Sequence, residues 1–295
     1  MTTAPRTRRR SDGSPSARTL LLTVLGEYVG YAGRDRVWSA AVVDALKACG
    51  VEETAARRAI TRLTHEGWLE TEPAGRFTVL VMRPRLVRLL HSWTARLRRA
   101  MEEELPWEGT WQQLLLRIPA AARTERTAVE EQLAFQGFGA LGQGVWIAAD
   151  PGGVGALREL VAELGLAGHA TWLTCRAGGA GADAALAAQA WDLSAVAPLH
   201  VDFLARFGGA VVPPAGGWSD EEAFVLRTRL VHAWRLTFER DPRLPDVLLP
   251  EGWPGREATA LFVRAWRSCH EAADRWWERL DRDPRGAGAG VAARA

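Results

Sequence analysis

Hydrophobic positions in the first third of the chain fall into short runs at helical spacing. Leu20–Val29 reads LLLTVLGEYV, an apolar run that predicts a helix. A second helix is predicted over Ala40–Cys49, with Ser39 as its N-terminal cap and Gly50 as its end. These two helices precede a longer segment in which apolar and polar positions separate into two faces.

That third helix is predicted within Val51–Trp68, VEETAARRAITRLTHEGW, and ends at Gly67. Its apolar stripe consists of Ala56, Ile60 and Leu63. Leu69–Val81 then contains two short segments of alternating polarity, separated by a turn at Pro73–Gly75. Three helices followed by a hairpin is the order of a winged helix-turn-helix domain.

The polar face of this third helix carries side chains that suit the major groove of duplex DNA. Arg guanidinium groups match guanine edges and phosphates in geometry, and Thr hydroxyls can bond to either. The residues expected to bind DNA are Thr54, Arg57, Arg58, Thr61, Arg62 and His65 on the helix and Arg76 in the hairpin. A solvated basic surface could show the same residues, but the order of the surrounding elements favours DNA binding.

Charge is distributed unevenly along the chain and supports this interpretation. Residues 1–101 contain 18 Lys and Arg against 9 Asp and Glu, a net charge of +9. The whole chain carries +2, so the remainder carries −7. Because the first third of the chain is basic and the rest is acidic, the first third is the part expected to face phosphates. The arginine-rich arm at the start is expected to be disordered; it could bind a minor groove or phosphates, or be a plain basic tail.

The middle of the chain alternates between strand and helix patterns. The predicted elements are the strand Thr110–Ile118, the helix Arg123–Gln136, a hairpin in Phe138–Ala148, the helix Gly155–Leu164 and the strand Ala170–Cys175. Their βαββαβ order is the ferredoxin-like plan. Because that plan serves many functions, it implies none by itself.

Helical patterns account for most of the remaining chain. The predicted helices are Arg85–Glu104 before the middle domain, and Ala182–Trp191, Ser194–Phe207, Ser219 to about Arg240, and Glu257–Leu280 after it. Ser219 and Glu222 have the spacing of a capping box. The helix Arg85–Glu104 suits either a linker or a dimerisation element.

Four stretches of the chain carry a family pattern. They are SARTLLLTVLGEYV (Ser16–Val29), GVEETAARRAITRLTHEGWL (Gly50–Leu69), GFGALGQGVWIA (Gly137–Ala148) and RTRLVHAWRLTFERDPRLPDVLLPEGWPG (Arg227–Gly255). Through them the chain resembles the PaaX family, bacterial repressors of phenylacetic acid degradation. The resemblance runs from about Ser16 to Leu280, and its last stretch is long and irregular.

The resemblance implies a winged-helix reader, a middle domain like that of the CRISPR adaptation nuclease, and a helical carboxy-terminal domain. It also implies a homodimer whose DNA binding is relieved by an aryl-acyl-CoA, which is phenylacetyl-CoA in the type case. The effector of this chain could be that compound, another acyl-CoA or a different aromatic metabolite.

The helix after Ser219 is the best candidate for the effector site. Its expected effector-binding residues are Arg229, His232, Trp234 and Arg235. Guanidinium groups could bind CoA phosphates, and the indole could stack on an adenine or aryl ring. In the structural alternative these side chains pair with Asp241, Asp246 or Glu251, or hold a domain interface.

The chain is thus predicted to be an α+β multidomain protein. The expected divisions are a disordered basic arm (1–16), a winged helix-turn-helix domain (17–84), a linker or dimerisation helix (85–108), a ferredoxin-like domain (109–177), a helical domain for effector binding and dimerisation (178–281) and a disordered tail (282–295).

The function expected of such a protein is sequence-specific repression of transcription, with double-stranded operator DNA and a small-molecule effector as partners. An activator or dual regulator is the alternative within this class. A metal-dependent nuclease in the ferredoxin-like domain is the alternative from another class, but Trp111–Ile118 contains no carboxylate for a divalent ion. An interaction module without DNA binding is disfavoured by the basic first third.

Several classes of site are not predicted at all. No nucleophile elbow, phosphate loop or zinc-protease motif occurs, so neither an enzyme nor a cofactor is expected. The three cysteines and six histidines lack ligand spacing, so no metal site is expected, and a reducing cytoplasm fits the unpaired thiols. No apolar run approaches the roughly 20 residues of a membrane span, and no secretory signal is recognised.

Overall fold

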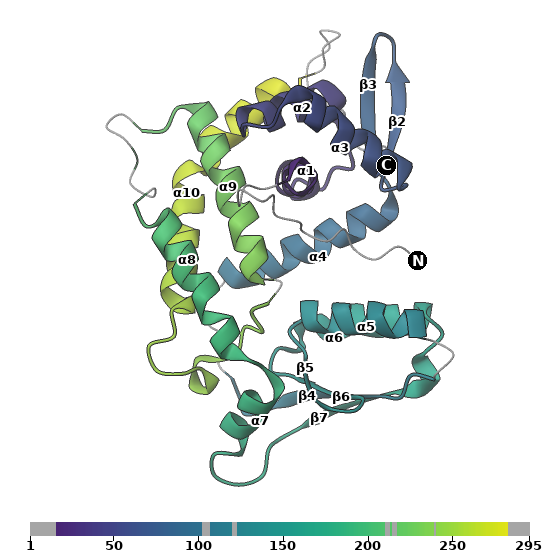
Figure 1. Cartoon of the computed structure of the whole chain (residues 1–295), viewed down its shortest axis with the longest axis vertical. Coiled ribbons are helices and arrows are strands. Elements are labelled where there is room, and N and C mark those ends of the chain that lie inside the picture. Colours follow the sequence, from purple (N-terminus) through teal and green to yellow (C-terminus); the bar gives the residue numbers. More distant parts are fainter. Residues whose placement is uncertain are drawn as a thin grey trace. The chain divides into compact units, whose positions relative to one another are not determined.

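The computed structural model describes residues 16–101, 107–119, 123–209, 213, 217–238 and 240–282 (Figure 1). The expected basic arm before Ser16 and the tail after Arg282 lie outside these ranges. The described residues form helices and two antiparallel sheets, which is the predicted α+β class. They divide into two compact units. The first combines the described parts of Met1–Glu102, Ala205–Arg235 and Thr259–Ala295, and the second those of Glu103–Leu204 and Leu236–Ala258.

Three helices begin the first unit, in the predicted order. They are α1 (Ala17–Val24), which continues into the π-helical turn η1 (Leu25–Gly30), α2 (Ser39–Ala48) and α3 (Glu53–His65). The predicted cap at Ser39 is wrong, because the extended backbone of Trp38 precedes the helix and Ser39 is its first residue. The helix α3 ends at Gly67, whose φ of +67° suits glycine, and the amide of Trp68 bonds to the carbonyl of Leu63.

A three-stranded sheet follows these helices. Its strands are β1 (Arg36–Trp38), β2 (Leu69–Ala74) and β3 (Phe77–Met82), in the order β1-β3-β2. The hairpin turn lies at Gly75 and Arg76 rather than at Pro73–Gly75, because Ala74 still pairs with Phe77 and leaves a two-residue turn. Pro73 lies within the edge strand β2, where its missing amide costs no sheet bond. The strand β1 was not predicted, because three residues are too few to show an alternation of polar and apolar positions.

The helix α4 (Pro84–Met101) begins at a proline, a residue that suits the first turn of a helix. It was expected as a linker or dimerisation helix, and in the structure it packs against η1 within the first unit. A Cβ added at Gly26 would lie 3.2 Å from Leu90 Cδ2, so a larger residue there would require the Leu90 side chain to shift.

Two helices from the end of the chain complete the first unit: α9 (Asp220–Phe238) and α10 (Gly255–Leu280). The predicted capping box of α9 is confirmed, since the Glu222 amide donates to Ser219 Oγ and the Ser219 amide donates to the Glu222 carboxylate. Phe224 of α9 and Trp277 of α10 are buried in the same core as α1–α3. The segment expected as one carboxy-terminal domain is therefore divided between the two units.

The second unit contains a four-stranded antiparallel sheet with strand order β5-β6-β4-β7. Its elements are β4 (Trp111–Leu116), α5 (Arg123–Phe135), β5 (Gly139–Gly142), β6 (Val145–Ala148), α6 (Val154–Glu163) and β7 (Ala170–Cys175), with short helical turns at η2 (Pro151–Gly153) and η3 (Ala167–His169). Leu114 on the sheet packs with Leu133 of α5 and Leu157 of α6. The order βαββαβ is the order predicted from the sequence.

Helical segments cover part of the other sheet face. They are α7 (Ala182–Ala190), η4 (Leu193–Ala195), which leads into α8 (Ala197–Phe207), and η5 (Asp246–Leu248). Trp111 and Ile147 of the sheet are buried there with Ala187 of α7. A Cβ added at Gly139 would lie 2.7 Å from the carbonyl oxygen of Ala190, so this close approach of α7 to β5 depends on glycine.

Candidate nucleic-acid interface

The helix α3 presents opposite chemistry on its two sides. Ala56, Ile60 and Leu63 are buried in the core of the first unit. The six DNA-binding residues predicted on this helix are all exposed: Thr54, Arg57, Arg58, Thr61, Arg62 and His65. Five of the six line one shallow depression, Thr54 being the exception. The structure therefore brings the predicted helical residues together on one solvent-facing surface, the α3 face.

Acidic residues at both edges of the α3 face hold two of its arginines. Arg57 Nη2 lies 2.8 Å from Glu53 Oε1, and Arg62 Nε lies 3.0 Å from Glu66 Oε1. Glu66 also accepts two hydrogen bonds of 2.6 Å from Arg18, which comes from α1. The bonds from Arg18 and then from Arg62 lower the pKa of Glu66 to about 2, against the opposing effect of burial.

The centre of the α3 face is less constrained. Among the described residues no ion pair is formed by Arg58, although its side chain is exposed between two paired arginines. The hydroxyl of Thr61 donates to the carbonyl oxygen of Arg57 at 3.0 Å, so its oxygen lone pairs face outward as acceptors. The face therefore offers donors and acceptors of the kind that base edges require.

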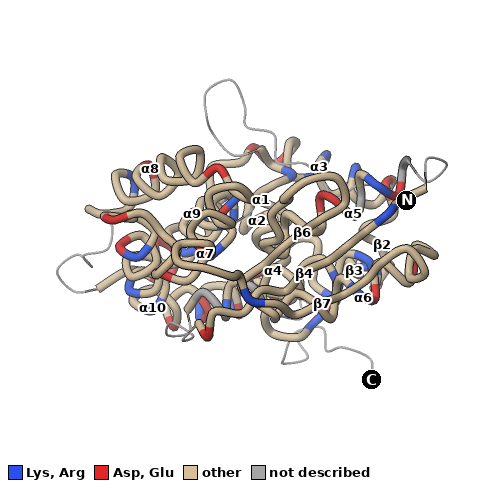
Figure 2. The backbone as a smooth tube through the Cα atoms, turned by 90° about the horizontal axis from the view of Figure 1, so that it is seen from below, with Lys and Arg blue, Asp and Glu red and all other residues tan. Residues whose placement is uncertain are grey.

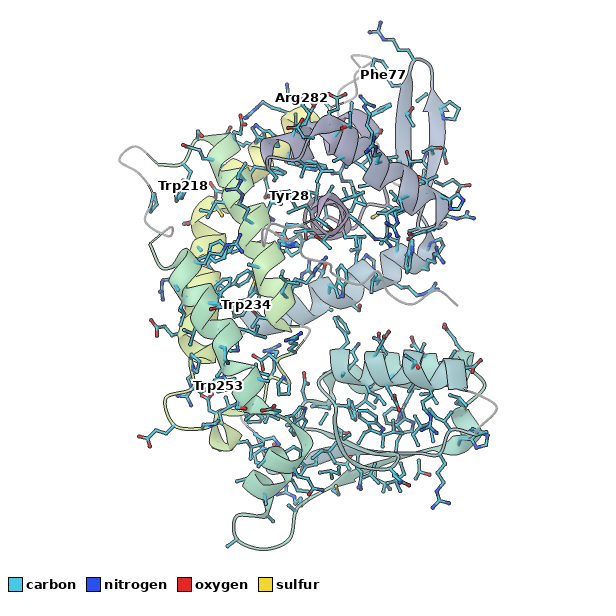
Figure 3. All side chains as sticks on the ribbon, viewed as in Figure 1. Tyr28, Phe77, Trp218, Trp234, Trp253 and Arg282 are labelled. Carbon is cyan, nitrogen blue, oxygen red and sulfur yellow. The ribbon has the colours of Figure 1, made fainter. Side chains whose placement is uncertain are left out.

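The hairpin β2–β3 adds one cation at its tip. Arg76 is exposed in the turn, and its guanidinium lies 4.9 Å from the ring centroid of Phe77, which is labelled at the tip of the hairpin in Figure 3. The strand β2 is acidic, but Glu70 pairs with Arg83 and Glu72 with Arg36. The cation at the tip is thus the part of the hairpin best suited to a phosphate or a minor groove.

Contacts from α4 fix the end of α3. The guanidinium of Arg85 lies 4.0 Å from the ring centroid of Trp68 and donates to the carbonyl oxygen of Glu66. Sequence reasoning missed Arg18, Glu66 and Arg85 as parts of this site. A single signal was present, because Glu66 stands four residues after Arg62, the spacing of a helical ion pair.

The predicted effector residues of α9 occupy different environments. His232 is buried, with its Nδ1 3.1 Å from the Thr23 hydroxyl of α1. Trp234 is buried and stacks on Phe262 of α10, with ring centroids 4.9 Å apart (Figure 3). The guanidinium of Arg235 lies 4.1 Å from the ring centroid of Trp93 of α4. Only Arg229 of the four is exposed.

Arg229 lines an open depression of about 580 Å³ between the end of α8 and the start of α9. The wall includes Arg206 and the apolar side chains of Val225 and Leu226. Glu221 and Glu222 also line it, and Glu222 is engaged in the capping box. Two guanidinium groups beside an apolar wall form a surface that suits an anionic ligand with an apolar part.

A buried polar network joins α1 to the carboxy-terminal helices. Arg227 Nε lies 2.7 Å from Glu27 Oε1, and both side chains are almost fully buried. Trp266 Nε1 donates to the same oxygen at 2.8 Å, and Arg227 Nη1 lies 2.6 Å from Asp274 Oδ1. Sequence reasoning missed this network. Its signal was Glu27, an acid inside an otherwise apolar helical run. The helix α10 carries both basic and acidic residues along its length (Figure 2).

The described residues also bear on metal binding and membrane insertion. In the described part of the chain, no three His, Cys, Asp or Glu side chains gather in a cluster that could hold a metal ion. No helix among the described residues is both long and apolar enough to cross a membrane.

Comparison with known proteins shows which family this chain belongs to. Residues 16–80 match the family described as PaaX-like protein, residues 104–187 match the PaaX protein central Cas2-like domain, and residues 191–279 match the PaaX-like protein C-terminal domain. The Transcriptional repressor PaaX of Escherichia coli (strain K12) is 28% identical over 265 residues, which are 88% of this chain and 82% of that protein. The chain belongs to the PaaX family, as its sequence predicted.

A solved structure is also similar to this chain. It is the uncharacterized protein Rv0674 from Mycobacterium tuberculosis, which is 25% identical with a TM-score of 0.53. The match covers 88% of this chain and 98% of that one. The likeness therefore extends over both compact units.

Proposed function

We propose that this protein is a sequence-specific, DNA-binding transcriptional repressor. The observation that carries the proposal is the α3 face, where an exposed set of Arg and Thr side chains stands on a helix whose opposite side is buried in the core. Such a helix can enter the major groove with its polar side toward the bases. The hairpin β2–β3 would act as the wing, with Arg76 at its tip.

Family membership supports the regulatory class, since a relative over most of the chain is a transcriptional repressor. In the same proposal, residues 17–84 act as a winged helix-turn-helix, and the sheet β5-β6-β4-β7 with α5 and α6 acts as a ferredoxin-like scaffold without nuclease activity. The protein would work in the cytoplasm as a homodimer, because two copies of α3 can contact two half-sites on one duplex.

An effector is proposed to bind on α9. Exposed Arg229, with Arg206 across the depression, would take the phosphates of an aromatic acyl-CoA or a related anionic metabolite. The ligand would also bind His232, Trp234 and Arg235. To do so, it would compete with the contacts of these side chains to α1, α10 and α4. Because those contacts position the helices of the DNA-binding unit, ligand binding would favour a state with weaker operator affinity.

Binding selection tests the DNA-binding proposal without a known operator. The purified full chain is incubated with a random duplex pool, bound duplexes are amplified over several rounds, and the enriched sequence is tested by fluorescence anisotropy. We expect one enriched motif that binds the wild type at least 10³-fold more tightly than a scrambled duplex, a typical specificity ratio. A variant with Arg57, Arg58 and Arg62 all changed to Ala should lose this binding while its circular dichroism spectrum stays unchanged. An unenriched pool would contradict the proposal.

A further inference from the structure

The three arginines of the α3 face differ in the partners that hold them. Arg57 Nε and Nη2 both donate to Glu53 Oε1, at 3.0 and 2.8 Å. Arg62 Nε donates to Glu66 Oε1 at 3.0 Å. Arg58 has no such bond in the part of the chain that the structure describes, so its whole guanidinium fork is available.

Helix geometry separates these residues into a centre and two flanks. Successive residues are rotated by about 100° on an α-helix. The central stripe therefore consists of Thr54, Arg58, Thr61 and His65. Arg57 lies on one side of this stripe with Glu53 beyond it, and Arg62 lies on the other side with Glu66 beyond it. Each acid thus draws its arginine away from the centre of the face.

Each of these acids also has a second cation. Glu66 is bonded to Arg18 through two hydrogen bonds of 2.6 Å, and Glu53 Oε2 lies 3.5 Å from Lys47 Nζ. If Arg57 or Arg62 leaves its carboxylate to bind a phosphate, that carboxylate therefore remains paired with its second cation. This arrangement lowers the cost of transferring the flanking arginines to DNA, because no carboxylate is left without a cation beside the phosphates.

We infer that the α3 face divides DNA recognition among its arginines, and this inference rests on the proposed function. Arg58 is the specificity-determining residue, and its free fork bonds to O6 and N7 of a guanine in the major groove. Arg57 and Arg62 bind phosphates on the two walls of the groove. Before DNA binds, Glu53 and Glu66 hold the flanking arginines apart from Arg58, so that one guanidinium per helix is left to reach the bases.

The test compares single variants on two duplexes, the motif enriched from the random pool and its scrambled version, over a range of salt concentrations. Arg58→Ala should lower affinity for the motif by about 5- to 150-fold, the equivalent of ~1–3 kcal/mol, and barely change affinity for the scrambled duplex. Arg57→Ala and Arg62→Ala should weaken both duplexes alike and reduce the salt slope by about one per lost phosphate contact. Arg267→Ala, an exposed arginine of α10, serves as the matched control.

Arg58→Lys sharpens the test, because it keeps the charge and removes the fork. It should bind the scrambled duplex like the wild type and lose preference for the motif. A repeated selection with Arg58→Ala should return a motif that lacks one G·C pair in each half-site, whereas selection with Arg62→Ala should return the original motif. If Arg58→Ala weakens both duplexes equally and keeps the motif, the division of roles is wrong while DNA binding stands. If no α3 variant changes affinity for either duplex, the proposed function itself fails.

Discussion

Arg227 of α9 and Glu27 of η1 form an ion pair of 2.7 Å in which both side chains are almost fully buried. The same Glu27 oxygen accepts a hydrogen bond of 2.8 Å from Trp266 of α10. Three segments that are distant in sequence therefore meet on one carboxylate. Most of α9 and α10 belongs to the unit that carries the α3 face. A change at Arg227 can therefore affect the α3 face through the packing of α1 against α3.

Removing one member of this pair should be costly. Arg227→Met leaves Glu27 buried with a single donor, and we expect unfolding free energy to fall by ~3–5 kcal/mol, as for other broken buried pairs. Urea denaturation followed by near-ultraviolet circular dichroism measures the change. The double variant Glu27→Leu/Arg227→Met should regain most of the loss. A double variant no more stable than the single one would show that the charges do not account for the effect.

The carboxyl of Glu66 should contribute acid-sensitive stability. Its pKa is lowered from 4.5 to about 2 in the folded protein, chiefly by Arg18. A lowered carboxyl pKa gives stability that is complete above the unfolded pKa and is lost as pH falls through the folded value. The stability difference between wild type and Glu66→Gln should therefore shrink between about pH 4.5 and 2. Thermal denaturation in that window tests this, and a pH-independent difference would contradict it.

Operator binding should depend steeply on salt. A dimer with two α3 faces and two hairpin tips should make on the order of 6–10 phosphate contacts, which costs roughly 10³–10⁵ in affinity between about 50 and 200 mM salt. Anisotropy titrations at five salt concentrations give the slope. A nearly flat plot of log affinity against log salt would contradict an electrostatic interface, whatever the sequence preference.

Effector binding should be linked to operator binding with equal strength in both directions. If an acyl-CoA weakens operator binding by a given factor, operator DNA must weaken acyl-CoA binding by the same factor. Calorimetric titration with phenylacetyl-CoA and related acyl-CoAs, with and without the enriched duplex, measures both. Arg229→Ala/Arg206→Ala should bind acyl-CoA more weakly and keep its DNA affinity. An unchanged response of this double variant would place the effector elsewhere.

Much of the fold was predictable because its signals are local. The end of α3 at Gly67, the capping box at Ser219 and the strand Ala170–Cys175 each depend on a few neighbouring residues, and all appear as predicted. The exposure of the six α3 residues predicted to bind DNA was predictable for the same reason, because helical spacing alone separates them from the buried stripe.

The parts that were not predictable depend on residues far apart in sequence. His232 and Arg235 carry the chemistry of a ligand site in sequence, yet in the structure they contact Thr23 and Trp93. The role of Arg18 at the α3 face could not be inferred, since its partner Glu66 lies 48 residues away. The division of the helical segment between two units likewise follows from contacts that no local pattern records.

The last described turn of the chain has a consequence for protein synthesis. Asp281, just after α10, accepts a hydrogen bond from the Trp38 amide at the start of α2 and pairs with Arg34, although 243 residues separate it from Trp38. A ribosome must therefore synthesise the chain through Asp281 before the unit that carries α3 can close its core. Chains that terminate before α10 lack Trp277 and leave the rings of Tyr28 and Phe224 uncovered. Such fragments should be cleared as misfolded protein before they compete with intact copies for operators.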